Sequence, residues 1–307
     1  MSKILVVFGA TGNQGGSVIR SVLADPKLSK EFKIRGVTRD PSKPAAQKLA
    51  EQGVDVVKAD LLDKGTLRNA LIGAHSVFAV TNYWEKASKE IEVTQGKNIS
   101  DVSKEIGVEH LIWSSLPNVT KLTDGKLSNV PHFDGKAEVE EYINALGVPA
   151  TFFLAGFYMQ NLKSAIKLGE DGKKTLAFTF PGDTEIPLFE ASADTGKFIA
   201  AILSSDYAKP RGKQVLGASG WFTPNEIITT FEEVTGQPAK YVQLPEEVFR
   251  GFLPEAFATE MLENFALIRD YQYYGPNAKE SLEESLKILN QPPTSFKEFV
   301  QRNGPWE

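Results

Sequence analysis

The sequence contains no cysteine, and this absence excludes several kinds of site at once. Disulfides, thiolate nucleophiles, zinc ribbons and iron–sulfur clusters all require the thiol group. Histidine is also scarce, because His75, His110 and His132 are the only three, and their spacing matches no metal-binding motif. We therefore expect no metal site in this protein.

A block of basic residues and an apolar run of membrane-spanning length are also missing. The chain has 34 Lys and Arg against 39 Asp and Glu, a formal net charge of −5, so we expect no direct binding to nucleic acid. A spanning helix needs about 18 or more consecutive apolar residues, and the first predicted strand starts too early to leave room for a signal peptide. We expect a cytoplasmic location, with the nucleus as an alternative, and no membrane association.

The strongest positive signal is the segment 3–16, KILVVFGATGNQGG. Its apolar run is typical of a parallel strand that is covered on both faces. The run leads into a GxxGxxG loop, Gly9-Ala10-Thr11-Gly12-Asn13-Gln14-Gly15, and a helical pattern follows. We expect Gly9 to make the tight turn, Gly12 to let the backbone approach a pyrophosphate, and Gly15 to let the helix pack against the strand. Helix N–H groups would then bind the phosphates, so the segment predicts a dinucleotide site.

The residue after the second predicted strand, 32–38, distinguishes NADP from NAD. Arg39 stands where an acidic residue would bind the ribose 2′-OH of NAD and an arginine would bind the 2′-phosphate of NADP. A hydrogen bond to such a charged group contributes about 1.5–3 kcal/mol. Lys43 is near enough to add to the same pocket, whereas Asp40 is the competing signal for NAD. The sequence favours NADP(H); the alternative is that Arg39 is a solvated loop charge.

Strand and helix patterns alternate through the first half of the chain, with further strands predicted at 54–58, 76–80, 110–113 and 150–154. Such alternation predicts an α/β fold with a doubly wound parallel Rossmann sheet. Residues 1–155 would form the NADP-binding domain. Residues 156–307 would form a smaller, mostly helical lobe with some strands, interwoven with the first domain rather than independent of it.

Polar residues follow these strands at the sheet edge where such folds bind ligands. Asp60 would hydrogen-bond the adenine amino group, with Leu61 against the ring; alternatively, Asp60 caps the helix predicted at 64–71. Other polar residues at this edge are Thr81, Asn82 and Tyr83 after the fourth strand, and Ser114 and Ser115 at the fifth.

The usual catalytic residues of a short-chain dehydrogenase are incomplete. Such an enzyme uses a serine after the fifth strand and a Tyr-x-x-x-Lys motif, but here His132 stands in the tyrosine position before Lys136. A histidine can act as a general acid, because its ordinary pKa is about 6.5, yet an adjacent ammonium group disfavours the imidazolium form. His132 and Lys136 are candidate catalytic residues. The alternative is that His132 only forms local hydrogen bonds and Lys136 only holds the ribose.

Several segments resemble the NmrA-like family of atypical short-chain dehydrogenases/reductases. They are GATGNQGGSV, VTRDP, VTNYWE, HFDGK and EVEEY, and the resemblance is strong over residues 1 to about 165 and looser beyond. It implies a Rossmann domain that binds NADP(H), lacks the catalytic tyrosine and, as in the animal redox sensor of the family, reports the cofactor balance to a regulatory protein partner.

The resemblance also implies roles for individual residues. It places the pyrophosphate at residues 9–14 and the 2′-phosphate at Arg39. The other implied contacts are Asp60 and Leu61 at the adenine, Thr81, Asn82 and Tyr83 along the ribose and nicotinamide, Lys136 at the nicotinamide ribose, and Tyr158, Met159, Gln160 and Asn161 over the nicotinamide. One residue departs from the pattern: Thr94 stands where the animal sensor has a cofactor-contacting lysine.

Two functions from different classes remain open at this point. The first is an NADP(H)-binding regulator that acts through a protein partner, with a homodimer as one form of association and without tyrosine-based catalysis. The second is an NADPH-dependent reductase of a quinone, an enone or a carbonyl compound, in which Lys136 or His132 assists. The missing tyrosine favours the regulator. The aromatic cluster 271–274 would be either a partner surface or core packing.

Overall fold

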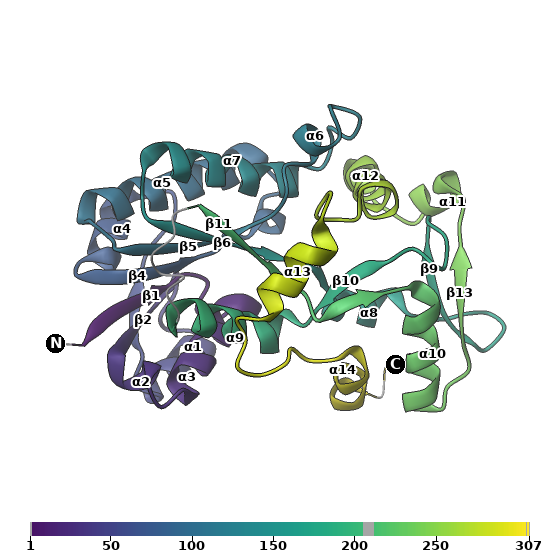
Figure 1. Cartoon of the computed structure of the whole chain (residues 1–307), viewed down its shortest axis with the longest axis horizontal. Helices are drawn as coiled ribbons and strands as arrows, with labels where there is room; N and C mark the ends of the chain where they lie inside the picture. Colours follow the sequence, from purple (N-terminus) through teal and green to yellow (C-terminus); the bar gives the residue numbers. More distant parts are fainter. Residues whose placement is uncertain (1, 205–211, 305, 307) are drawn as a thin grey trace.

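The computed structural model describes residues 2–204, 212–304 and 306. A seven-stranded sheet with the order β11-β6-β5-β4-β1-β2-β3 forms its centre, and all neighbouring strands are parallel (Figure 1). The strands are β1 (Lys3–Val7), β2 (Phe32–Thr38), β3 (Asp55–Lys58), β4 (Ala74–Ala79), β5 (His110–Ser115), β6 (Ala150–Ala155) and β11 (Lys213–Gly217). This is the predicted doubly wound sheet, and its order reverses direction between β1 and β4.

Helices cover both faces of the sheet (Figure 1). On one face lie α4 (Lys64–Leu71), α5 (Lys89–Ile106) and α7 (Pro131–Leu146), and on the other α1 (Asn13–Ala24), α2 (Leu28–Glu31), α3 (Pro44–Glu51) and α9 (Ala191–Ser204). Leu5, Val6 and Val7 of β1 are fully buried, as expected for a parallel strand between two helical layers. Helix α7 begins at Pro131, because proline fits the first turn of a helix.

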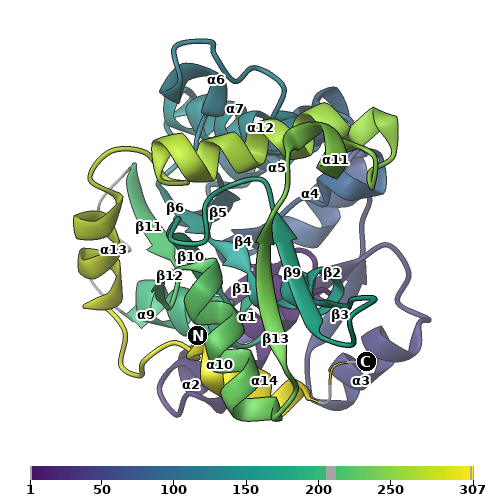
Figure 2. The same cartoon turned by 90° about the vertical axis from the view of Figure 1, so that its right-hand side faces the viewer.

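The second lobe combines helices with two small sheets of order β12-β10-β7 and β13-β9-β8. Its strands are β7 (Phe157–Tyr158), β8 (Lys167–Leu168), β9 (Lys174–Phe178), β10 (Ile186–Phe189), β12 (Gly220–Phe222) and β13 (Ala239–Gln243). Its helices are α8 (Met159–Ala165), α10 (Pro224–Thr235), α11 (Glu246–Arg250), α12 (Glu255–Tyr271), α13 (Ala278–Leu286) and α14 (Phe296–Asn303). Helix α12 lies across the top of this lobe in Figure 2, on the side next to α7 of the Rossmann domain.

The two halves of the chain are interwoven. Strand β11 and helix α9 follow residue 155 in the sequence, yet β11 pairs with β6 and α9 packs on α1. A Cβ atom on Gly196 of α9 would lie 2.2 Å from the carbonyl oxygen of Ser17 in α1, so the two backbones are in close contact there. The division of the chain into residues 1–155 and 156–307 stays a prediction.

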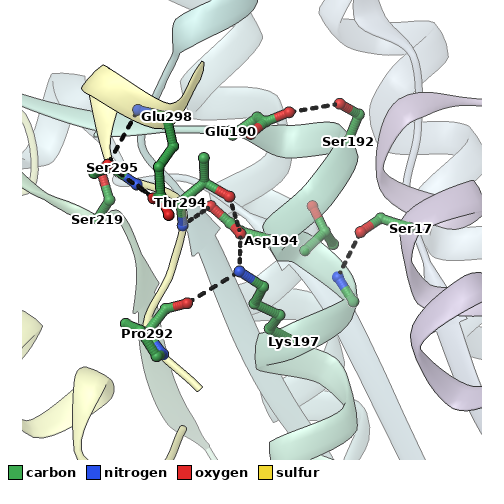
Figure 3. Close-up of polar contacts among 12 residues, drawn as sticks. Ser17, Glu190, Ser192, Asp194, Lys197, Ser219, Pro292, Thr294, Ser295 and Glu298 are labelled. Carbon is green, nitrogen blue, oxygen red and sulfur yellow. Dashed lines mark hydrogen bonds and ion pairs between the residues drawn. The ribbon is translucent and has the colours of Figure 1, made fainter. Parts of the chain in front are cut away.

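A polar network fastens the C-terminal segment to α9 (Figure 3). The buried carboxylate of Asp194 accepts hydrogen bonds from the backbone N–H and the hydroxyl of Thr294, both at 2.9 Å. Lys197 pairs with the same carboxylate at 2.9 Å and donates to the carbonyl oxygen of Pro292 at 3.0 Å. The segment that leads into α14 is thereby held against the Rossmann layer.

Two further short helices connect the layers, η1 (Tyr83–Glu85) after β4 and α6 (Val119–Leu122) before α7. No helix in the described part of the chain is both long and apolar enough to span a bilayer.

Candidate functional site

The glycine loop has the geometry that the sequence predicts. Gly9 has a φ of 62°, a left-handed conformation that favours glycine, and the N–H of Gly12 donates to its carbonyl oxygen at 2.9 Å. A Cβ atom on Gly15 would lie 2.3 Å from that same oxygen. The tight turn at Gly9 and the close packing at Gly15 are therefore confirmed.

The N-terminus of α1 has the features of an anion-binding site. Gly12 is the residue before the first turn, and no side chain caps the helix there. The first N–H groups of a helix have no partner within the helix, and the helix dipole favours negative charge at this end. An uncapped end beside a glycine turn fits a pyrophosphate group.

Arg39 extends from the end of β2 and forms an ion pair with Glu85 of η1. The arginine side chain is 66% exposed, whereas that of Glu85 is 34% exposed. Asp40, the residue that would indicate NAD, is hydrogen-bonded within its own loop. Its carboxylate accepts hydrogen bonds from the N–H and the hydroxyl of Ser42. These two hydrogen bonds lower the pKa of Asp40. Arg39 remains the predicted 2′-phosphate contact, and the sequence did not indicate its present partner, Glu85.

Asp60 does not cap the following helix. Its carboxylate accepts from the N–H of Leu62 at 2.9 Å, and Asp63 is the residue that caps α4 through the N–H groups of Gly65 and Thr66. The alternative prediction for Asp60 is therefore wrong, because the chain makes one more turn before α4 begins. The exposed Asp60 stays a predicted adenine contact.

A cavity of about 300 Å³ opens at the carboxyl ends of β4, β5 and β6. It brings together predicted residues from both halves of the chain, namely Gln14, Thr81, Asn82, Tyr83, Ser114, Ser115, His132, Lys136, Tyr158 and Asn161. Sequence reasoning missed the residues that the second lobe adds, Phe157, Met261, Asn264 and Tyr273. A pocket of this size suits a small molecule.

Lys136 is paired with a buried carboxylate. Its Nζ lies 2.6 Å from Oε1 of Glu92 and 2.9 Å from the hydroxyl oxygen of Thr81, and that hydroxyl also donates to Glu92 at 2.7 Å. Glu92 is only 1% exposed and Lys136 12% exposed. The lysine therefore has a fixed position at the cavity wall with its charge compensated, and the sequence did not identify Glu92 as its partner.

His132 has its own carboxylate partner. Its Nδ1 contacts Oε1 of Glu260 in α12, and the hydroxyl of Tyr83 donates to the other oxygen of Glu260 at 3.2 Å. Burial, and next the charge of Glu260, raises the pKa of the Tyr83 hydroxyl well above its usual range. The local hydrogen bond predicted for His132 is thus present, but it joins the two lobes, and the ring still lines the cavity.

The hydroxyl of Ser115 is hydrogen-bonded to another side chain and is not free for the catalytic role that its position suggests. It donates to the carboxylate of Glu140 at 2.5 Å, and Gln214 donates to the other oxygen of that carboxylate at 2.7 Å. Burial raises the pKa of Glu140 above its ordinary value. The hydroxyl proton of Ser115 is therefore engaged behind the cavity.

Only part of the predicted segment 158–161 borders the cavity. The Tyr158 hydroxyl accepts a hydrogen bond from Nε2 of Gln14 at 2.5 Å, and Asn161 also lines the cavity. In contrast, Met159 is fully buried in the apolar core of the second lobe, and Gln160 donates to Ser192 at 2.9 Å. Neither Met159 nor Gln160 lines the cavity, because the helix α8 that begins at Met159 turns them away from it.

The aromatic cluster 271–274 contributes to the core. Tyr273 is buried and donates to the carbonyl oxygen of Ala155 at 3.2 Å, and Tyr274 donates to that of Leu154 at 3.3 Å. The core-packing interpretation is confirmed for these two residues. Thr94, the departure noted above, is exposed and donates to the carbonyl oxygen of Glu90.

A family model described as "NmrA-like family" matches residues 1–300. The chain belongs to the NmrA-like family. One relative is an NmrA-like family domain-containing oxidoreductase, hkm9 of Aspergillus hancockii, 31% identical over 91% of this chain and 87% of the relative. A second such oxidoreductase, malD of Malbranchea aurantiaca, is 34% identical over 79% of this chain and 76% of its own length.

Solved structures share the fold of this NmrA-like chain. NmrA, described as a negative transcriptional regulator, gives a TM-score of 0.82 at 22% identity and covers 98% of this chain and 95% of its own. The NADPH-dependent quinone oxidoreductase QOR2 of Escherichia coli gives 0.75 at 24% identity, over 97% of this chain and 99% of its own. That enzyme was solved with NADPH, and NmrA was solved with NADP and with NAD.

Proposed function

We propose that this NmrA-like protein binds NADP(H) and reduces a small neutral carbonyl compound, such as a quinone or an enone, in the cavity beside the cofactor. The observation that carries the proposal is the cavity itself. It lies at the sheet edge where the nicotinamide end of the cofactor would be held, and residues of the second lobe border it. Beside the residues predicted to hold the nicotinamide, the second lobe adds Phe157, Met261, Asn264 and Tyr273, and this additional lining supports a second ligand next to the cofactor.

The residues present fit the cofactor. The uncapped N-terminus of α1 would hold the pyrophosphate, Arg39 the 2′-phosphate, and Lys136 the nicotinamide ribose. NADPH supplies a hydride when it is bound. The fit agrees with the cofactors named for NmrA, for QOR2 and for the Citrobacter triphenylmethane reductase, which has a TM-score of 0.77.

His132 is the proposed proton donor for the substrate oxygen. Glu260 holds the ring through Nδ1, which leaves Nε2 as the nitrogen that can face a ligand in the cavity. A carboxylate in this position fixes the orientation of the imidazole. Because Glu92 compensates the charge of Lys136, the lysine ammonium that the sequence placed beside His132 has its own partner.

A second candidate function is an NADP(H)-dependent regulator that acts through a protein partner. Two observations favour it: histidine in place of the catalytic tyrosine, and the engagement of Ser115 by Glu140. A regulatory partner, a homodimer, and a cytoplasmic or nuclear location belong to this second proposal.

A panel of quinones, enones and aldehydes tests the two proposals, with NADPH oxidation followed by absorbance. We expect turnover of at least one class by the wild-type protein, and a loss of at least tenfold in kcat for His132→Gln. The double variant Lys136→Met, Glu92→Gln removes both charges of the buried pair, so that neither charge is left buried without a partner. The control is Lys121→Ala, which removes an exposed ion pair. NADPH binding without turnover across the panel would contradict the reductase and favour the regulator.

A further inference from the structure

Helix α12 borders the cavity through Met261 and Asn264, and it carries two buried polar side chains. Glu260 and Asn264 are 6% and 5% exposed, and they are one helical turn apart, so they share a face of the helix. The carboxylate of Glu260 is used by His132 and Tyr83. Asn264 also lines the cavity, but its Nδ2 has no hydrogen-bond partner among the described residues.

A buried amide nitrogen without a partner is uncommon in native proteins, because more than nine in ten buried polar groups are hydrogen-bonded. Several buried side chains of the described residues have a nitrogen or oxygen atom without a partner, but only Gln14, through Oε1, and Asn264, through Nδ2, border the cavity. Gln14 belongs to the glycine loop and its other amide atom is bound to Tyr158. Asn264 comes from the second lobe, and it borders the cavity together with Phe157, Met261 and Tyr273 of that lobe.

We propose that Asn264 is a ligand-binding residue whose side-chain N–H donates a hydrogen bond to a carbonyl oxygen of the compound that fills the cavity. This inference deepens the proposed function and rests on it for the assignment of the cavity as a substrate site. It names a specificity determinant on α12 that is separate from the proton donor His132.

The charges around Asn264 select a neutral ligand. The two basic side chains that border the cavity in the described part of the chain, Lys136 and His132, each contact a carboxylate. An anionic ligand would therefore meet no uncompensated cation, whereas a ligand with a neutral acceptor oxygen would satisfy the free donor. The rings of Tyr83, Trp84 and Phe133 border the same space and favour a planar, apolar body.

Binding of 1,4-naphthoquinone to the full-length protein loaded with NADP+ tests this role, because NADP+ cannot reduce the quinone. The protein has no cysteine, so the quinone cannot form a thiol adduct during calorimetry. Naphthalene, which has the same rings without the oxygens, is the matched ligand. The variant is Asn264→Leu, which keeps the approximate size of the side chain and removes its donor. Asn69→Leu, at an exposed position of α4, is the matched control.

We expect Asn264→Leu to weaken naphthoquinone binding by about tenfold or more, and to leave naphthalene and NADP+ binding unchanged. Because the substitution also removes a buried unpaired donor, Tm should rise by about 2 °C or more. A fall in Tm would instead identify Asn264 as a structural residue and overturn the proposal. Equal losses for both ring compounds, unchanged naphthoquinone affinity, or no naphthoquinone binding by the wild type would also overturn it. Naphthoquinone binding through Asn264 without NADPH turnover would refute the reductase and leave this inference standing.

Discussion

The ion pair between Arg39 and Glu85 leads to a testable prediction about the selectivity for NADPH over NADH. In the structure, the guanidinium group that is expected to bind the 2′-phosphate is engaged by a carboxylate on η1. A phosphate group would have to compete with that carboxylate for the same N–H donors. Glu85→Gln removes the charge of the competitor and should therefore strengthen the binding of NADPH but not of NADH.

The expected size of the effect follows from the exposure of the pair. An exposed ion pair contributes about 0.2–1 kcal/mol, so its loss should tighten NADPH binding by roughly 1.4- to 5-fold. Arg39→Ala removes the contact with the 2′-phosphate itself, which is worth about 1.5–3 kcal/mol, and should weaken NADPH binding by roughly 10- to 150-fold. NADH affinity should stay within about twofold in both variants, because NADH lacks the 2′-phosphate.

Calorimetric titration of the four proteins in the double-mutant cycle, with NADPH and with NADH, measures these effects. In the Arg39→Ala background, Glu85→Gln should have no further effect, because the two side chains act through one contact. Glu105→Gln, which breaks the exposed pair with Arg68 between α5 and α4, is the control. An equal change in NADPH and NADH affinity on Glu85→Gln, or an effect that persists without Arg39, would refute the reasoning.

Two predictions concern stability. Gly196→Ala should destabilise the fold by about 1–3 kcal/mol in urea unfolding, because its Cβ would lie 2.2 Å from the carbonyl oxygen of Ser17. The control Gly16→Ala should be neutral or stabilising, because the nearest atom there is the flexible end of an arginine side chain at 3.3 Å. Equal effects of the two substitutions would contradict this account. Burial, and next His75, lowers the pKa of His110 from 6.5 to about 4. Its stabilising contribution is therefore complete above pH 6.5 and is lost as the pH falls toward 4, so unfolding free energy should drop by about 2 kcal/mol between pH 7 and pH 5. Most of that drop should be absent in His110→Gln, and an identical pH dependence of the variant would exclude His110 as its source.

Local patterns in the sequence were sufficient to predict the Rossmann layer. Apolar runs and glycine spacing act over a few residues, and they led to the sheet class and the turn at Gly9. Errors occurred where two local signals competed. Asp60 and Asp63 are both plausible caps for α4, and only the path of the chain selects Asp63.

The partners of the charged residues could not be predicted in the same way, because they come from distant segments. Glu92 is 44 residues from Lys136 in the sequence, and Glu260 is 128 residues from His132. No periodicity or motif connects residues at such separations. The sequence by itself determined the fold class and the glycine turn of the dinucleotide loop, since these depend on local backbone preference and burial pattern. Only the tertiary structure decided that α12 borders a cavity at the sheet edge and that Lys136 and His132 there each contact a carboxylate, because packing between segments distant in the sequence brings those side chains together.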